Sequence, residues 1–305
     1  MIRTLLKKLP FPLCALMLAC ASAGNLLKPL SPPLYLFCGG LALILGLLWA
    51  VRTFLFPGQW RREMEDPSLA SVGGTFSMGL MILSGYALPF SRILAILIWA
   101  AGLSFHIVLM VWFTVHFMMP PVLSKVYASY FIVYVGIAAA ALPSSALGQA
   151  AVGLVCSCFA MAVFFPLLLL LILRCAKEGE PEDFRKPLLG ICAAPASLCL
   201  AAYLTCASRP RADLVCLFLL FSLILYTLAM LRLFFYLRLP WTPAFSAYTF
   251  PTVISAVAVQ KAAGFLSLPE SLETLLRTVA FFQTVIACLI LTVVLIRMLI
   301  CFIHT

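Results

Sequence analysis

Residues able to do chemistry are sparse in this sequence and do not cluster. The 305-residue chain has 12 cysteines, 3 histidines and 10 acidic residues. The cysteines are scattered through apolar runs without C-x-x-C or His/Cys ligand spacing, so we expect them to behave as small apolar residues. No nucleophile–base pair, phosphate-binding loop or metal constellation is found in the sequence. An enzyme is therefore not expected, and neither a cofactor nor a metal is predicted.

Hydroxyl side chains are the polar groups that recur inside the apolar runs. Hydroxyl donors and free helix ends can replace part of the hydration shell of an anion. The expected chemistry is therefore the binding and passage of anions. The candidate hydroxyls are Ser22, Ser77, Ser84, Ser129, Ser197, Ser246, Thr249 and Ser255.

The composition is that of a membrane protein. Apolar residues make up 65% of the chain and charged residues 10%, whereas soluble domains carry roughly 25% charged residues. No segment is polar enough to form a separate soluble domain, so we predict a single transmembrane domain over residues 1–305. The net charge of +10 comes from Lys and Arg at helix ends, not from a basic stripe. Nucleic acid is therefore not an expected partner, whereas the lipid bilayer is.

Apolar runs long enough to cross the bilayer define the elements. About 20 helical residues span a hydrocarbon core of roughly 30 Å. The acidic residues lie between these runs, apart from Asp213 at the start of one. We predict an all-α polytopic protein of ten transmembrane helices, at residues 11–27, 33–55, 74–89, 91–118, 122–142, 146–174, 187–207, 212–238, 243–264 and 275–303.

The distribution of basic residues sets the orientation. With the N-terminus in the cytoplasm, 14 of the 20 Lys and Arg residues lie on the cytoplasmic side. Both termini are then cytoplasmic, and the linkers 56–73 and 175–186 are cytoplasmic loops of mixed charge. A cleavable leader is the alternative for the first run, because basic residues precede it and Ala21-Ser22-Ala23 resembles a cleavage site.

The ten runs fall into two classes that alternate. The odd-numbered runs are shorter and richer in small residues, which mark close helix approach in membranes. Prolines lie in or at the start of odd runs, and each interior proline frees a carbonyl that protein or water must satisfy. The alternation favours an inner ring of five odd helices, which could enclose a pore, inside an outer ring of five even ones. These prolines are Pro12, Pro121, Pro195, Pro243 and Pro251.

The odd runs favour an anion over a cation. None of them contains Asp or Glu, so there is no obvious cation site or carboxylate proton relay. Lys125, at the cytoplasmic start of the fifth run, could draw anions toward the pore mouth, although a topology-setting lysine is the plainer interpretation. His106, in the fourth run, is interpreted as an interhelical hydrogen-bonding residue or, alternatively, as a proton relay.

The seventh to ninth runs carry a family resemblance. The segment from Trp241 through Phe250-Pro251 to Ala256 resembles the ninth helix of the tellurite-resistance/dicarboxylate transporter family, which includes the plant slow-type anion channels. Lys186 to Tyr203, with Pro195, resembles the seventh helix of this family. Leu231-Arg232-Leu233-Phe234 is similar to the end of the eighth helix, and Leu9-Pro-Phe-Pro with Gly24-Asn25 is similar to the first.

The resemblance implies a fold, an assembly and a gate. It implies ten helices as five hairpins in a quasi-symmetric barrel, usually a homotrimer in the bacterial inner membrane, with a pore lined by the odd helices in each protomer. It implies that the first helix is retained and that a phenylalanine of helix nine, here Phe250, plugs the pore. Without the resemblance, lipid or core packing would be the expected role of Phe250. The expected pore lining is Ser22, Gly24, Ser77, Ser84, Ser129, Pro195, Ser197, Ser246, Thr249, Pro251 and Ser255.

Two departures from the family pattern put conductance and selectivity in doubt. Ala196 replaces the second proline of helix seven, and the proline usual near the start of helix five is replaced around Lys125 and Val126.

The absence of acidic residues from the odd runs and the family resemblance together predict a gated channel for small inorganic anions. The alternatives are a secondary transporter of an oxyanion or C4-dicarboxylate, such as tellurite, sulfite or malate, and a structural subunit without transport.

Overall fold

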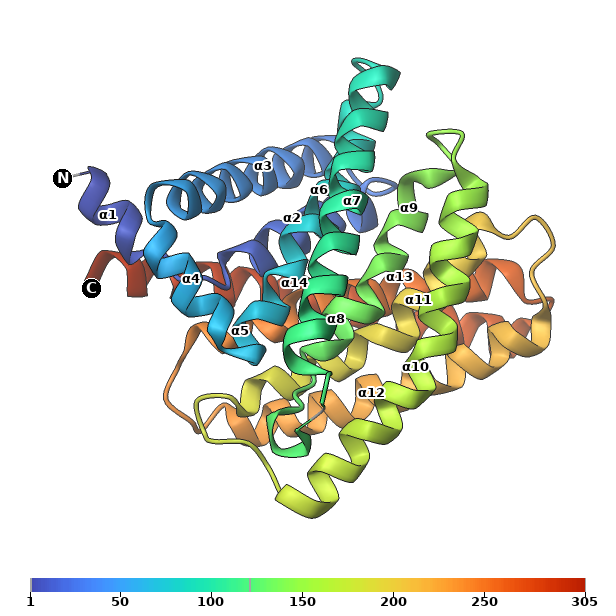
Figure 1. The fold of residues 1–305 in the computed structure, drawn as a ribbon. Helices are drawn as coiled ribbons and strands as arrows, with labels where there is room; N and C mark the ends of the chain where they lie inside the picture. The colour runs from blue at the N-terminus through green and yellow to red at the C-terminus, as the bar shows by residue number, and fades with distance from the viewer. Residues whose placement is uncertain (1, 121, 305) are drawn as a thin grey trace.

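The computed structural model describes residues 2–120 and 122–304 and is built from helices (Figure 1). Pro121 lies outside the described residues. The helices fall into long continuous ones and groups of short ones. The long helices are α3 (Pro32–Leu55), α7 (Arg92–Phe117), α10 (Ala150–Glu178), α12 (Ala212–Tyr236) and α14 (Glu270–His304). The remaining elements are α1 (Ile2–Lys8), α2 (Leu13–Leu27), α4 (Pro57–Glu65), α5 (Pro67–Val72), α6 (Gly74–Ala87), η1 (Leu123–Lys125), α8 (Tyr130–Tyr134), η2 (Gly136–Ala140), α9 (Ala141–Ser144), η3 (Lys186–Ala193), α11 (Ala194–Cys206), η4 (Pro243–Tyr248) and α13 (Thr249–Phe265).

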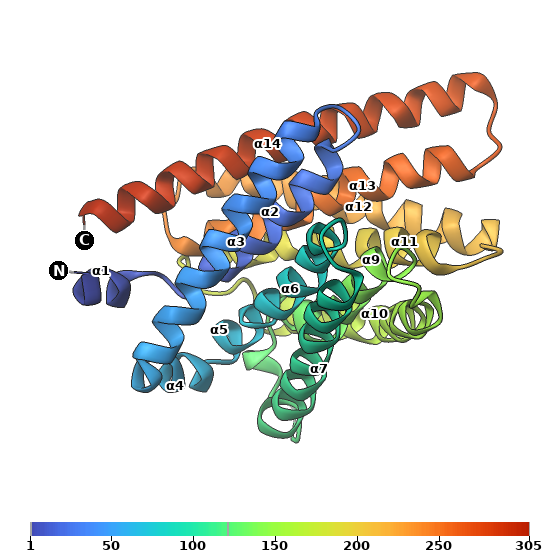
Figure 2. The same cartoon turned by 90° about the horizontal axis from the view of Figure 1, so that it is seen from above.

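Each predicted run coincides with one helix or with a series of short ones, and the all-α polytopic class is confirmed. By length and composition, seven helical segments of the described residues are able to cross a membrane, and α2 is a shorter apolar helix. The fifth and ninth runs consist of shorter pieces, so the count of ten spans stays a prediction. α1 and the end of α14 lie at the same end of the molecule (Figures 1 and 2).

The even-numbered runs form long helices on the outside. α3, α7, α10, α12 and α14 are uninterrupted, and only 22–39% of the residues in their apolar windows are buried. Their exposed side chains are large and apolar, such as Phe37, Leu220 and Phe281. A continuous helix satisfies its own backbone, so it is the structure that can face lipid.

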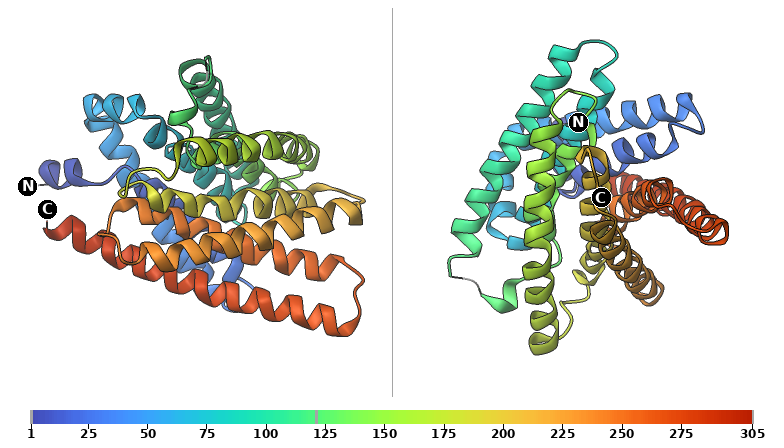
Figure 3. Two further views of the ribbon diagram at one scale, coloured as in Figure 1. Left: turned by 90° about the horizontal axis from the view of Figure 1, so that it is seen from below. Right: turned by 90° about the vertical axis from the view of Figure 1, so that its right-hand side faces the viewer.

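The odd-numbered runs form a closed inner ring. α2 contacts α6, α6 contacts η2, η2 contacts α11, α11 contacts α13, and α13 returns to α2. In the two inner spans that are long enough to compare, 78% of the residues are buried. Each outer helix packs against inner ones, and the hairpins point outward in different directions in the right-hand view of Figure 3.

The inner segments are interrupted where their prolines lie. η3 gives way to α11 just before Pro195, and η4 gives way to α13 just before Pro251. Neither of these two prolines therefore lies in the interior of a helix. Both lie in the first turn of an α-helix, where a backbone N–H has no intrahelical acceptor and its loss costs little.

The fifth run differs most from the prediction of one helix. Residues 122–142 contain η1, an extended stretch, α8, η2 and the start of α9. His106 of α7 satisfies the backbone where this run changes from α8 to η2, because its Nε2 lies 3.0 Å from the carbonyl oxygen of Val133. Its Nδ1 lies 2.7 Å from Ser77 Oγ of α6. This geometry supports the interhelical interpretation of His106.

The loop 56–73 is more structured than the sequence suggested. It contains α4 and α5, and Asp66 caps α5 by accepting hydrogen bonds from the backbone N–H groups of Ser68 and Leu69. α4 packs against the end of α3, and α5 leads through Gly73 into α6. These two short helices place residues of the loop at one end of the inner ring.

Candidate functional site

A cavity of about 480 Å³ lies inside the inner ring. All five inner segments contribute to its wall, and no residue of α3, α7, α10, α12 or α14 does. The inner segments contribute Phe11, Pro12, Ala15, Leu18, Ser68, Leu69, Val72, Thr75, Met78, Phe131, Ile132, Val135, Gly136, Leu188, Ile191, Ala194, Pro195, Leu198, Pro243, Ala244, Ser246, Ala247, Phe250 and Pro251.

The spacing of these residues places one face of each segment on the cavity. Leu188, Ile191 and Ala194 recur every three residues through η3, and Leu198 follows four residues later in α11. Residues three apart align in a 3₁₀-helix, and residues three or four apart share a face of an α-helix. The change of helix type therefore keeps one continuous apolar stripe on the cavity.

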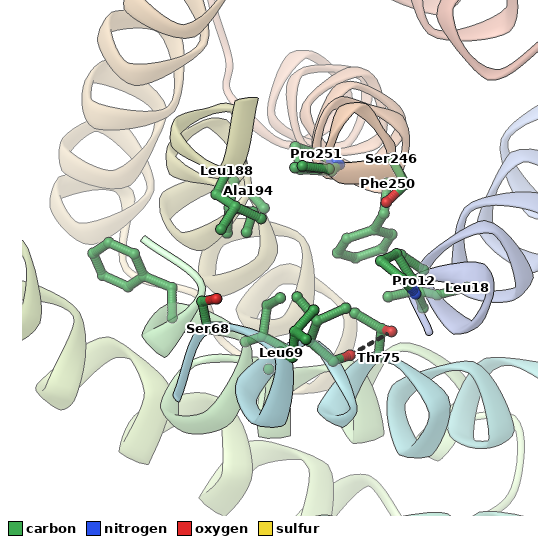
Figure 4. A pocket seen from close by; sticks show the side chains of 18 of the residues that line it. Pro12, Leu18, Ser68, Leu69, Thr75, Leu188, Ala194, Ser246, Phe250 and Pro251 are labelled. Atoms are coloured by element: carbon green, nitrogen blue, oxygen red, sulfur yellow. Dashed lines mark hydrogen bonds between the residues drawn. The ribbon is translucent and has the colours of Figure 1, made fainter. Parts of the chain in front are cut away.

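Phe250 is one of the residues that line this cavity. It belongs to the first turn of α13, and its side chain is only 6% exposed. Figure 4 shows its ring projecting from α13 into the space bordered by Pro12 and Leu18 on one side and Ala194 on the other. Phe250 and Pro251 are the last residues of the ninth run that line the cavity. The ring of Phe250 therefore forms part of the cavity wall.

The opposite end of the cavity is polar. Glu63, Asp66, Phe184, Arg185 and Thr242 complete the wall there, and they come from the segments that join the helices. Glu63 forms a bidentate ion pair with Arg52, whose side chain is 1% exposed. Asp66 pairs with Arg185, with 2.7 Å between Oδ2 and Nη2. Both carboxylates at this mouth are therefore neutralised by arginines.

Some of the predicted lining residues meet at the cavity and others do not. Phe250, Pro251, Pro195 and Ser246 line it together. Ser22, Gly24, Ser77, Ser84, Ser129, Ser197, Thr249 and Ser255 lie outside it. The structure thus brings together the residues around the two prolines but places most of the predicted hydroxyls elsewhere.

The hydroxyls outside the cavity hydrogen-bond to the protein. Ser197 Oγ lies 2.7 Å from Ser222 Oγ and 3.0 Å from Ser255 Oγ, which joins α11 to α12 and α13. Ser129 accepts a hydrogen bond from Ser71. Ser77, Ser84 and Thr249 each donate to a carbonyl one turn earlier. Ser22 Oγ is buried without a hydrogen-bond partner among the described residues.

The basic residue that lines the cavity mouth is Arg185. Lys125 is exposed in η1 and does not line the cavity, whereas Arg185 does. Arg185 and Asp66 were missed because charged linkers of this length are usually solvated. Thr75 was missed among the hydroxyls of the third run, although it is buried and lines the cavity. The described residues contain no group of His, Cys, Asp and Glu side chains that could hold a metal ion.

Comparison with protein families agrees with this architecture. The family model described as SLAC1, voltage-dependent anion channel, matches residues 9–305. The match begins just before the first cavity-lining residue, Phe11, and covers all five inner segments. No curated protein matches the chain.

Proposed function

The chain belongs to the SLAC1 family of voltage-dependent anion channels, and we propose that it is a gated channel for small inorganic anions with Phe250 as its gate. Membership gives the general function, an anion channel or transporter in a membrane, in a family that is not one of enzymes. The gate and the kind of anion are the proposed part. The proposed path runs through the cavity inside the inner ring.

The observation that carries the proposal is a cavity that is walled by the inner segments and into which the ring of Phe250 projects. A bulky apolar ring in a narrow passage blocks ions sterically and excludes water. Beyond this level the same segments carry fully buried small residues, including Ala21, Ala139, Ala201 and Ala258. Their small side chains would leave room for a passage, but ions would enter it only after the ring of Phe250 moves aside.

The charges around the cavity support an anion as the permeating ion. Its wall is apolar except for a few hydroxyls and the residues at the mouth. The two carboxylates there, Glu63 and Asp66, are already paired with Arg52 and Arg185. A cation entering the cavity would therefore meet no unpaired carboxylate among the residues that line it.

A coupled transporter for an oxyanion or a C4-dicarboxylate is the second candidate. The observation in its favour is that the inner segments enclose a cavity with a polar mouth, as expected for a binding chamber. The absence of carboxylates in the inner segments favours the channel, because such groups couple transport to protons.

We also propose the assembly and placement implied by the family and the charge pattern. Residues 1–305 form one transmembrane domain in a bacterial inner membrane, with both termini and the cavity mouth on the cytoplasmic side. The excess of basic residues at this end supports the orientation. Three protomers assemble, each with its own path.

Anion flux into proteoliposomes tests the gate. Purified wild-type protein, Phe250→Ala and Phe113→Ala are compared under a chloride or nitrate gradient. Phe113 is a matched control, because its ring is fully buried in α7 and does not line the cavity. We expect Phe250→Ala alone to raise anion flux. Equal flux in all three proteins would contradict the gate, and saturable flux that follows an imposed proton gradient would favour the transporter.

A further inference from the structure

The mouth of the cavity carries a single cation among its described lining residues, Arg185. Arg52, which also lies at this end, is buried at 1% exposure against Glu63 and lines no part of the cavity. The side chain of Arg185 is 20% exposed. An anion approaching the cavity therefore meets the guanidinium of Arg185 before any other basic group of the wall.

The guanidinium of Arg185 is held in one orientation. Its Nη1 donates to the hydroxyl of Tyr127 at 2.5 Å, and its carbon atom lies 5.1 Å from the ring centroids of both Tyr127 and Phe184. Its Nε is 3.8 Å from an oxygen of Glu182, whose side chain is 62% exposed. A planar fork fixed by rings and a hydroxyl is preorganised for an anion with two oxygens.

The chain's own carboxylate occupies this fork. Asp66 Oδ2 accepts from Nη2 of Arg185 at 2.7 Å. The other oxygen, Oδ1, accepts from the backbone N–H and the hydroxyl of Ser68, at 2.8 and 2.6 Å. The cap of α5 thus holds Asp66 in place independently of the arginine. Asp66 is a tethered carboxylate that takes the position an incoming anion would take.

We propose that Arg185 is an anion-binding site at the entrance and that Asp66 is its built-in competitor. The ligand class is a small monovalent anion. Planar oxyanions such as nitrate are favoured over chloride, because the guanidinium can donate to two oxygens at once. The proposal rests on the proposed function, since it places the first binding site of the path. An anion that displaces Asp66 takes over the pairing with the guanidinium, so it is held at the entrance of the proposed path.

Removing the competitor by a change of one side-chain group tests the site. Asp66→Asn keeps an oxygen for capping α5, because asparagine is as good an N-cap as aspartate. In a Phe250→Ala background, we expect Asp66→Asn to lower the half-saturating nitrate concentration of the current by about three- to fivefold, the range for displacing a partly exposed ion pair. Arg185→Gln is expected to raise that concentration, and the double variant Asp66→Asn, Arg185→Gln to behave like Arg185→Gln alone.

A matched control separates a site from a general field effect. Asp183→Asn removes the same charge from the loop that carries Arg185, but Asp183 pairs with Lys186 at 2.8 Å, and neither residue lines the cavity. We expect no change in half-saturation for this variant. Equal shifts in Asp66→Asn and Asp183→Asn would overturn the proposal, as would a rise in half-saturation for Asp66→Asn.

A second measurement does not depend on conduction. The melting temperature of purified wild type, Asp66→Asn and Arg185→Gln is recorded against sodium nitrate at constant ionic strength. Nitrate is expected to raise it most in Asp66→Asn and not at all in Arg185→Gln. If nitrate raises the melting temperature in this order but no variant carries an anion current, the proposed function would be contradicted and the site supported. Equal responses of the three proteins would overturn the site, even if Phe250→Ala conducts.

Discussion

The inner and outer helices differ in the continuity of their backbone and in the side chains that they carry. The outer helices are continuous from end to end, and large apolar side chains cover them. Three of the inner segments, those with η2, η3 and η4, change between 3₁₀ and α geometry, and small or hydroxylated residues are buried along the inner segments. Broken backbone is tolerated at membrane depth only where protein or water can satisfy it. Among the membrane-spanning segments, the irregular backbone therefore lies in the inner ring that encloses the cavity, and the outer helices are continuous.

The same contrast holds for hydrogen bonds between the two rings. Trp99 of α7 donates to the carbonyl oxygen of Ala140 at 2.9 Å, at the end of η2. His106 of the same helix reaches the carbonyl of Val133 where α8 ends. Outer helices thus supply the partners that the broken inner backbone needs. The outer ring is a support for an inner wall that cannot satisfy its own polar groups.

The largest expected effect comes from filling the cavity. Ala194 lines it and is 7% exposed, whereas Ala101 of α7 is exposed on the outer surface. In a Phe250→Ala background, we expect Ala194→Trp to reduce anion current by at least about tenfold, because the ring fills a narrow apolar passage. Ala101→Trp is the control and is expected to leave the current unchanged. Equal currents in the two variants would show that the path does not run through the inner ring.

The ion pair between Arg52 and Glu63 is expected to stabilise the junction of α3 and α4. Glu63→Gln leaves the buried guanidinium of Arg52 without its counter-ion, and the Arg52 Nε already has no partner among the described residues. Breaking a buried ion pair in this way costs about 3–5 kcal/mol of the free energy of unfolding. Asp213→Asn, in a pair with Arg211 in which both side chains are more than half exposed, is expected to cost about 0–1 kcal/mol.

Reversible unfolding in mixed micelles measures both variants. A small loss for Glu63→Gln, equal to that for Asp213→Asn, would mean that Arg52 is solvated in the membrane-bound protein. The junction would then not form part of the rigid support.

A smaller effect is expected from glycines of the two rings. A Cβ on Gly190 of η3 would lie 2.7 Å from the ring of Tyr248, whereas a Cβ on Gly40 of α3 would meet nothing within 4 Å. We expect Gly190→Ala to destabilise the fold by about 1–3 kcal/mol through overpacking. Gly40→Ala is expected to be neutral or to stabilise by up to about 1 kcal/mol, because alanine favours the helix. Thermal melting in detergent checks both, and equal melting temperatures would contradict the difference in packing.

The smallest effect is expected at Ser197. Its hydroxyl joins α11 to Ser222 of α12 and to Ser255 of α13. Interhelical hydrogen bonds in membranes contribute about 0.6 kcal/mol on average, so Ser197→Ala is expected to lower stability slightly and leave anion current unchanged. A clear change in the current at unchanged stability would restore the sequence-based interpretation of Ser197 as a pore-lining residue.

Length and hydropathy alone predicted much of the fold. The long outer helices carry a continuous apolar pattern, so the limits of α3 and α12 agree with the predicted runs within two residues. The inner ring was predictable from small residues and prolines, because both indicate close packing and broken backbone. The interruption of the fifth run was not, since residues 122–142 are as apolar as an unbroken helix.

The site was less predictable than the fold. Phe250, Pro251, Pro195 and Ser246 line the cavity, and their roles as gate and pore lining stay predictions. A hydroxyl in a small-residue helix, however, faces either a passage or a neighbouring helix, and composition does not distinguish the two. Ser197 and Ser255 are examples of the second case, because their hydroxyls hydrogen-bond to each other. The position of Arg185 depends on its contacts with Asp66 and Tyr127, which are distant in sequence.

The reversal potential of Phe250→Ala in a planar bilayer tests whether anions pass through the inner ring and whether Phe250 closes that path. Purified wild type and Phe250→Ala are compared under a steep gradient of potassium chloride. We predict a large current for Phe250→Ala alone, reversing near the equilibrium potential of chloride. A current that reverses near the equilibrium potential of potassium, or the same negligible current in both proteins, would contradict an anion path through the inner ring closed by Phe250.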